Sequence, residues 1–142
     1  MTFVVTFSVE CLPIPKGRPR FKRAGKFIQT YTPKKTLDFE ELLRSRAVEA
    51  MGDSEPLDSP IEAFFYIRLP VPQSYSKKRS KACLDGLESP IKRPDIDNYA
   101  KSILDAMNGV IFKDDSQVIS LHITKRYDLT PGVDIMVREY LR

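Results

Sequence analysis

The chain has 142 residues, of which 42% are hydrophobic and 30% are charged, and its formal net charge is +4. This length suits one domain, residues 1–142, that buries a proper core, so no second domain is needed. The N-terminal apolar run is too short and too polar for a signal peptide or a membrane span. We therefore expect a cytoplasmic protein without a membrane partner. The positive charge suits an anionic partner but does not identify one.

The first half of the chain begins with a strand over residues 2–10, which are rich in Val and Phe. Prolines and a glycine at positions 13, 15, 17 and 19 then predict a basic loop without regular structure, about residues 13–32. A helix follows, capped by Thr32 with Pro33 as its first residue, and it ends at Gly52. Its apolar side is predicted to consist of Phe39, Leu43, Ala47 and Ala50.

The second half alternates strands and helices. We expect a strand over 61–69, a short basic helix over 75–84, a helix over about 98–108, and strands over 117–127 and 133–141. The last two strands flank Thr130-Pro131-Gly132, which predicts a hairpin. Strands mixed with helices predict an α/β (α+β) fold, a single small domain with a mixed β-sheet packed by helices.

An acidic motif begins the helix over 98–108. Arg93-Pro94-Asp95-Ile96-Asp97-Asn98 precedes it, Lys101 lies one turn further on, and Asp114-Asp115 follows the helix. Carboxylate oxygens are the ligands that Mg²⁺ prefers, and nearby cations suit a phosphate substrate. The helix carries the chain roughly 16 Å away and the extended return covers about 20 Å, so Asp115 can come back beside Asp97. The motif predicts a metal-dependent site that cleaves phosphodiesters.

Each part of this motif also has a plainly structural interpretation. The residues before the helix can serve only as a cap, and Asp114-Asp115 can serve only as a turn. Lys101 can be the surface partner of Asp97 or Asp105 on the same helix. The conjunction of these features, rather than any one of them, favours the metal site.

A run of basic residues without any acid extends from Lys16 to Lys35 and is interleaved with Phe21, Phe27 and Tyr31. Basic side chains release counterions from phosphates, and aromatic side chains stack on unpaired bases. The alternative is a solvated loop whose aromatic residues anchor it in the core. We expect DNA contacts from Lys16, Arg18, Arg20, Lys22, Arg23 and Lys26.

Other kinds of site are disfavoured. Cys11 and Cys83 have no ligand-spaced partner, so neither a zinc site nor a disulfide framework is expected. The chain has no phosphate-cradling glycine loop and no Gly-x-Ser-x-Gly elbow. We therefore expect no nucleotide cofactor and no serine-hydrolase chemistry. The single histidine, His122, is predicted to lie on a strand surface rather than to act in chemistry.

The chain resembles the RusA family of Holliday junction resolvases, found in bacteria and their prophages, at these positions: Lys92 to Asn98, Lys101, Leu104 to Gly109, Lys113 to Val118, and Lys125-Arg126. Pro13 to Arg20 and Tyr31 to Lys34 resemble the prophage-type members. The resemblance implies a small homodimeric endonuclease, dependent on Mg²⁺ with Mn²⁺ as a substitute, that nicks four-way junction DNA symmetrically.

The same resemblance assigns residues to the site. It implies that Asp95, Asp97 and Asp115 are the essential carboxylates and metal ligands, and that Lys101 is the essential lysine. Asp114 matches an acidic neighbour in the family, which would support the metal ligands without binding the metal itself. Two other functions stay open: a metal-dependent nuclease acting on flaps or other branched DNA, and a DNA-binding accessory that kept the fold without the chemistry.

Overall fold

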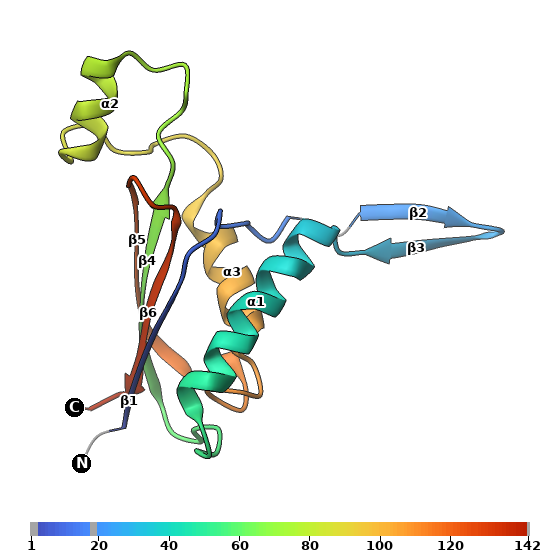
Figure 1. Ribbon diagram of the computed structural model, residues 1–142. Helices are drawn as coiled ribbons and strands as arrows, with labels where there is room; N and C mark the ends of the chain where they lie inside the picture. The colour runs from blue at the N-terminus through green and yellow to red at the C-terminus, as the bar shows by residue number, and fades with distance from the viewer. Residues whose placement is uncertain (1–2, 18–19, 142) are drawn as a thin grey trace.

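A four-stranded mixed sheet with two long helices on one face forms the body of the protein (Figure 1). The computed structural model describes residues 3–17 and 20–141. The sheet order is β1 (Val4–Val9), β6 (Gly132–Glu139), β4 (Ile61–Leu69), β5 (Val118–Tyr127). The helices are α1 (Lys34–Met51), α2 (Lys77–Leu84) and α3 (Ile96–Met107), and a 3-10 turn, η1 (Asp115–Gln117), precedes β5. The predicted α+β fold with a mixed sheet is confirmed.

The core lies between the sheet and the helices α1 and α3. Alternate residues of β4, namely Ile61, Ala63, Phe65 and Ile67, are fully buried, as the period of two in a strand requires. Leu43 of α1 and Ile103 of α3 are also fully buried. Burying each large side chain of this kind contributes about 1.5–3 kcal/mol.

The predicted hairpin between the last two strands is wrong. β5 pairs parallel with β4, and β6 pairs antiparallel with the opposite edge of β4, so β4 lies between them. Neighbouring strands are about 4.8 Å apart, so the connection over residues 128–131 is long enough to cross one strand. β6 also pairs with β1 from Val4 opposite Arg138 to Val9 opposite Val133. A turn motif between two strands does not reveal a third strand that comes from elsewhere in the sequence.

Helix α1 agrees with its prediction apart from details at its ends. Pro33 lies at the N-cap rather than at the first helical position, and Gly52 ends the helix with a φ of 54°. A positive φ suits glycine because it has no Cβ. The buried side consists of Thr36, Phe39, Leu43, Ala47 and Met51, whereas Ala50, predicted to belong to it, is exposed.

The basic loop expected over residues 13–32 contains regular structure, which corrects that prediction. Strands β2 (Arg20–Ala24) and β3 (Phe27–Tyr31) form an antiparallel hairpin that extends away from the body (Figure 1). The prolines all precede β2, so they do not interrupt it, and Gly25 has the positive φ of 63° that a tight turn needs. We call residues 20–31 the arm.

The remaining elements agree with the sequence pattern within two residues. The strand over 61–69 has the predicted bounds, and the strands over 117–127 and 133–141 are β5 and β6. Helix α2 begins at Lys77 instead of residue 75, because the side chain of Ser76 caps it by accepting from the Arg79 N–H. Helix α3 begins at Ile96. None of the described helices combines the length and the hydropathy that crossing a bilayer requires.

Candidate active site

The side of helix α3 that points away from the core carries both acidic and basic residues. Its buried residues include Tyr99, Ile103 and Met107, and this leaves Asp97 and Lys101 exposed on the outer side. Asp95 is the N-cap residue, but its side chain makes no capping hydrogen bond. A helix N-terminus carries partial positive charge and favours anions, so it suits both these carboxylates and a phosphate.

Asp115 reaches this side of α3 because the chain after the helix is firmly anchored. The side-chain amide of Gln117 donates to the carbonyl oxygens of Leu57 (2.9 Å) and Ser59 (3.0 Å). Phe112, fully buried, pairs with Leu57 in an isolated bridge. These contacts fix η1 beside α3, with Asp115 at its first position.

Lys101 lies between two carboxylates. Its ammonium nitrogen is 3.0 Å from Oδ1 of Asp105 and 3.9 Å from Oδ2 of Asp115. The hydrogen bond with Asp105 is the main cause of a raised pKa of Lys101, which therefore stays positively charged at neutral pH. Of the two surface partners considered for Lys101, the described structure pairs it with Asp105 and not with Asp97. The geometry thus brings Lys101 and Asp115 together.

The side chain of Asp114 forms hydrogen bonds within the η1 turn. Its carboxylate accepts from the Ser116 N–H at 3.0 Å, and the Gln117 side chain accepts from the Asp114 N–H at 2.9 Å. Hydrogen bonding from Ser116 lowers the pKa of Asp114, because it favours the charged form. This side chain stabilises the turn that carries Asp115.

The donor set suits a divalent ion in its chemistry. Asp95 and Asp97 are carboxylates at the outer start of α3, and Asp115 is partly buried beside Lys101. Within residues 3–17 and 20–141, no three acidic, histidine or cysteine side chains are close enough to form a ready-made metal site. Mg²⁺ usually takes one or two protein carboxylates together with waters and substrate phosphate oxygens. An ion at these aspartates would therefore need further ligands from water and from a substrate.

The residues predicted to bind DNA fall into two groups. Lys22, Arg23 and Lys26 lie on the arm, which extends into solvent. Lys16 instead lies beside the site, with its ammonium 2.8 Å from Glu40 and 3.2 Å from Asp105. Arg18 lies outside the described residues, and so does the side chain of Arg20 at the start of β2.

The aromatic residues of the arm are exposed as well. Phe21 is 70% exposed and Phe27 is 75% exposed, so these side chains do not anchor the arm in the core. Exposed rings next to cations suit stacking on unpaired bases. His122 lies elsewhere, on the sheet face opposite the helices, where its exposed ring stacks on Phe64 with 4.6 Å between centroids.

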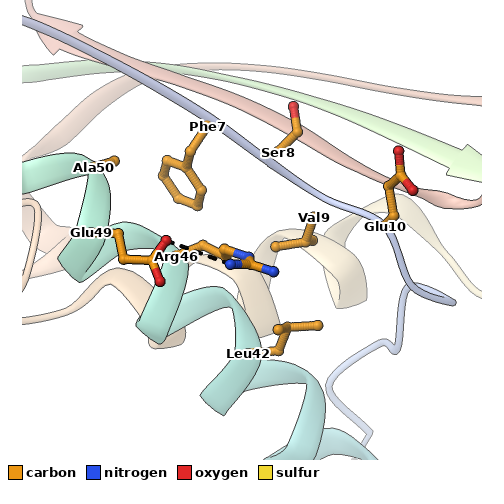
Figure 2. Close-up of a pocket in the computed structure, with 8 residues that line it drawn as sticks. All are labelled: Phe7, Ser8, Val9, Glu10, Leu42, Arg46, Glu49 and Ala50. Atoms are coloured by element: carbon orange, nitrogen blue, oxygen red, sulfur yellow. Dashed lines mark hydrogen bonds and ion pairs between the residues drawn. The ribbon is translucent and has the colours of Figure 1, made fainter.

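A groove between β1 and α1 is separate from the acidic side of α3. Figure 2 shows the side chains around it, with Arg46 and Glu49 on α1 directed toward each other. It encloses about 810 Å³, and none of the predicted site residues lines it. Its lining consists of Phe7, Ser8, Val9, Glu10, Leu42, Arg46, Glu49 and Ala50.

The sequence did not reveal the contacts that two residues make at the site. Asp105 joins Lys101 to Lys16, and the ammonium of Lys125 donates to the carbonyl oxygens of Lys92 and Pro94, both at 2.9 Å. Asp105 was considered only as an i,i+4 partner of Lys101, which is a common pair on helices and does not indicate a contact with Lys16. The role of Lys125 depends on β5 lying beside the loop before α3, which only the fold shows.

An α+β domain with carboxylates at a helix start, a neighbouring lysine and a basic arm is the arrangement expected of a nuclease. Comparison with known families agrees: the family model described as "Endodeoxyribonuclease RusA" matches residues 10–138. The chain therefore belongs to the RusA family of endodeoxyribonucleases. It is also similar to "Uncharacterized protein YqaN" of Bacillus subtilis (strain 168), with 33% identity over 137 residues, which cover 95% of this chain and 96% of that protein.

Proposed function

We propose that the protein is a Mg²⁺-dependent endonuclease that resolves four-way DNA junctions by symmetric paired nicking in recombination and repair. The observation that carries this proposal is the position of Lys101, whose ammonium lies beside Asp115 at the acidic side of α3. Family membership supports cleavage of DNA, and the cations of the arm suit a DNA partner. We expect the activity in the cytoplasm, where the DNA of a bacterial or prophage genome lies.

Asp95, Asp97 and Asp115 would hold the metal ion, with Mn²⁺ as a substitute for Mg²⁺. The ion would polarise the scissile phosphate and lower the pKa of a bound water. Lys101 would approach the same phosphate and neutralise negative charge that develops during cleavage. The N-terminal end of α3 adds partial positive charge on the same side.

Resolution of a junction requires two cuts in strands of like polarity. A homodimer with two-fold symmetry provides one site for each strand, and a four-way junction has nearly the same symmetry. Recognition would then depend mainly on junction shape, with the arm contacting phosphates or unpaired bases.

One experiment separates this proposal from its alternatives. Cleavage of four-way, flap and linear duplex DNA is measured with Mg²⁺, with Mn²⁺ and with a chelator. Paired nicks in the four-way junction that need the metal would support the proposal. Preferred cutting of flaps would replace it by a different branched-DNA nuclease, and metal-independent binding without cleavage would identify a DNA-binding accessory.

A further inference from the structure

We infer that Asp105 is a positioning residue that holds the ammonium of Lys101 beside Asp115. Asp105 is itself held by Lys16, which also pairs with Glu40. This inference rests on the proposed function, because it concerns how the lysine of the same site reaches a substrate phosphate. It assigns Lys16 to the support of the site instead of to direct DNA contact.

The two oxygens of the Asp105 carboxylate have different partners. Oδ1 lies 3.0 Å from Lys101, and Oδ2 lies 3.2 Å from Lys16. Lys16 in turn donates to Oε1 of Glu40 on α1 at 2.8 Å. Charges of alternating sign thus run from α1 through the N-terminal segment to the outer side of α3.

Burial changes along this series. The side chains of Glu40, Asp105 and Lys16 are 16%, 21% and 23% exposed, whereas Lys101 is 57% exposed. Ion pairs shielded from water are stronger and less mobile than exposed ones. The shielded end of the network therefore keeps the Asp105 carboxylate in place, and only Lys101 extends toward solvent, where a substrate would bind.

The backbone of the N-terminal segment is fixed to the same helix. The Lys16 N–H donates to the carbonyl oxygen of Asn98 at 2.8 Å. The hydroxyl of Ser102, which is fully buried, donates to the carbonyl oxygen of Ile14 at 2.9 Å. Lys16 cannot move away from Asp105 without breaking these bonds as well.

An ordinary helix-surface pair does not account for this arrangement. Acid before base is the more favourable order at i,i+4, and here the lysine comes first. Lys81 of α2 and Asp85 at its C-cap have the same order and spacing, but they are 81% and 49% exposed, and the described structure gives neither a second charged partner. This pair is a matched control, because it shares the local geometry of Lys101 and Asp105 without the support behind it.

Positioning matters because a long lysine side chain has many rotamers. A group held in its reactive geometry loses less entropy when it engages the transition state. Asp105 also lies closer to Lys101 than Asp115 does, at 3.0 Å against 3.9 Å. Without Asp105, the ammonium would be free to move onto Asp115 or into solvent.

The test is a double-mutant cycle on single-turnover cleavage of a four-way junction, with protein and Mg²⁺ saturating. We expect Asp105→Asn to lower the rate roughly 10- to 100-fold, with junction affinity and melting temperature nearly unchanged. In a Lys101→Ala background, Asp105→Asn should not lower the cleavage rate further, because Asp105 affects the reaction only through Lys101. Asp85→Asn should leave the rate at the wild-type value.

A second measurement does not depend on cleavage. NMR relaxation of the lysine side chains should show that Lys101 becomes more mobile in Asp105→Asn than in the wild type, whereas Asp85→Asn should leave Lys101 unchanged. If Asp105→Asn does not fold, Lys16→Gln takes its place in both measurements, with a smaller effect in the same direction.

The outcomes are distinct. A wild-type rate in Asp105→Asn, or an equal loss with and without Lys101, would overturn the inference while the proposed function stands. If the wild-type protein cuts no DNA, the proposed function fails, and the mobility of Lys101 alone decides whether Asp105 positions it.

Discussion

The ammonium of Lys125 lies 2.9 Å from the carbonyl oxygen of Pro94, the residue directly before Asp95. This hydrogen bond ties the loop that enters α3 to strand β5. Lys125 pairs in register with Ile67, a buried residue of β4, so its side chain leaves the sheet on the side of the helices. The position of Asp95 therefore depends on a residue thirty positions further along the chain.

Replacing Lys125 by Met should loosen this loop and lower the cleavage rate roughly 10- to 100-fold, because small displacements of catalytic groups are costly. Junction affinity should change less than the rate. Arg126→Met is the matched control, since it removes a neighbouring cation that points to the other face of the sheet. Equal losses in both variants would mean that net charge, rather than the hydrogen bond with Pro94, is responsible.

The carboxylates can be tested one at a time. Changing Asp95, Asp97 or Asp115 to Asn should abolish cleavage while junction binding and folding remain, because the amide keeps the shape and loses the charge. If one of these variants still cuts at the wild-type rate, the replaced aspartate is not a metal ligand. Asp114→Asn should be mild, because asparagine caps turns and helices about as well as aspartate.

Lys101→Ala separates a catalytic lysine from a surface ion pair. An exposed i,i+4 pair is worth well under about 1 kcal/mol, so stability should hardly change in either case. If Lys101 faces the scissile phosphate, single-turnover cleavage should fall by roughly two to three orders of magnitude. Arg should restore little, because its planar guanidinium places charge differently from an ammonium. A near-normal rate for Lys101→Ala would leave only the carboxylates in the site.

The arm should contribute affinity rather than catalysis. On duplex DNA, removing one cation that neutralises a phosphate lowers the slope of log affinity against log salt by roughly 0.9. Changing Lys22, Arg23 and Lys26 to Ala should therefore flatten this slope by about two to three. Removing three cations from α2, at Lys77, Lys78 and Lys81, is the control. Equal flattening by both triple variants would show that overall charge decides the affinity.

The oligomeric state provides a further check. If the protein acts as a homodimer, light scattering after gel filtration should give about twice the chain mass of 16.3 kDa. A strict monomer at micromolar concentration would favour the flap nuclease or the accessory protein, since paired nicking needs two sites.

The sequence predicts local structure well and distant partners poorly. The strand over 61–69 and the glycine that ends α1 were both predicted from local signals, and the structure agrees with both. The hairpin of β5 and β6 is wrong because the strand between them comes from earlier in the chain. The arm is missed because prolines disrupt regular structure only where they stand, and the hairpin begins directly after the last of them.

The candidate site likewise has features that the sequence predicts and features that it does not. Chain lengths allow Asp115 to return to α3, and the structure places its carboxylate 3.9 Å from the ammonium of Lys101. Its predicted position beside Asp97 stays a prediction. The ion pair between Lys16 and Glu40 joins two separate elements, and no spacing in a single sequence indicates such a pair. In the sequence, Lys16 is therefore indistinguishable from the other cations of the basic run.

The pairing of β1 with β6 has a consequence for the order of events during synthesis. Val4 meets Arg138 across the sheet, so β1 must wait until β6 has been made before its backbone pairs with that strand. Until then, the segment that carries Lys16 to α3 follows a strand that is not yet paired with β6. A nascent chain stalled before β6 would expose an unpaired β1, so the segment that supports the candidate site is anchored only after β6 has been made.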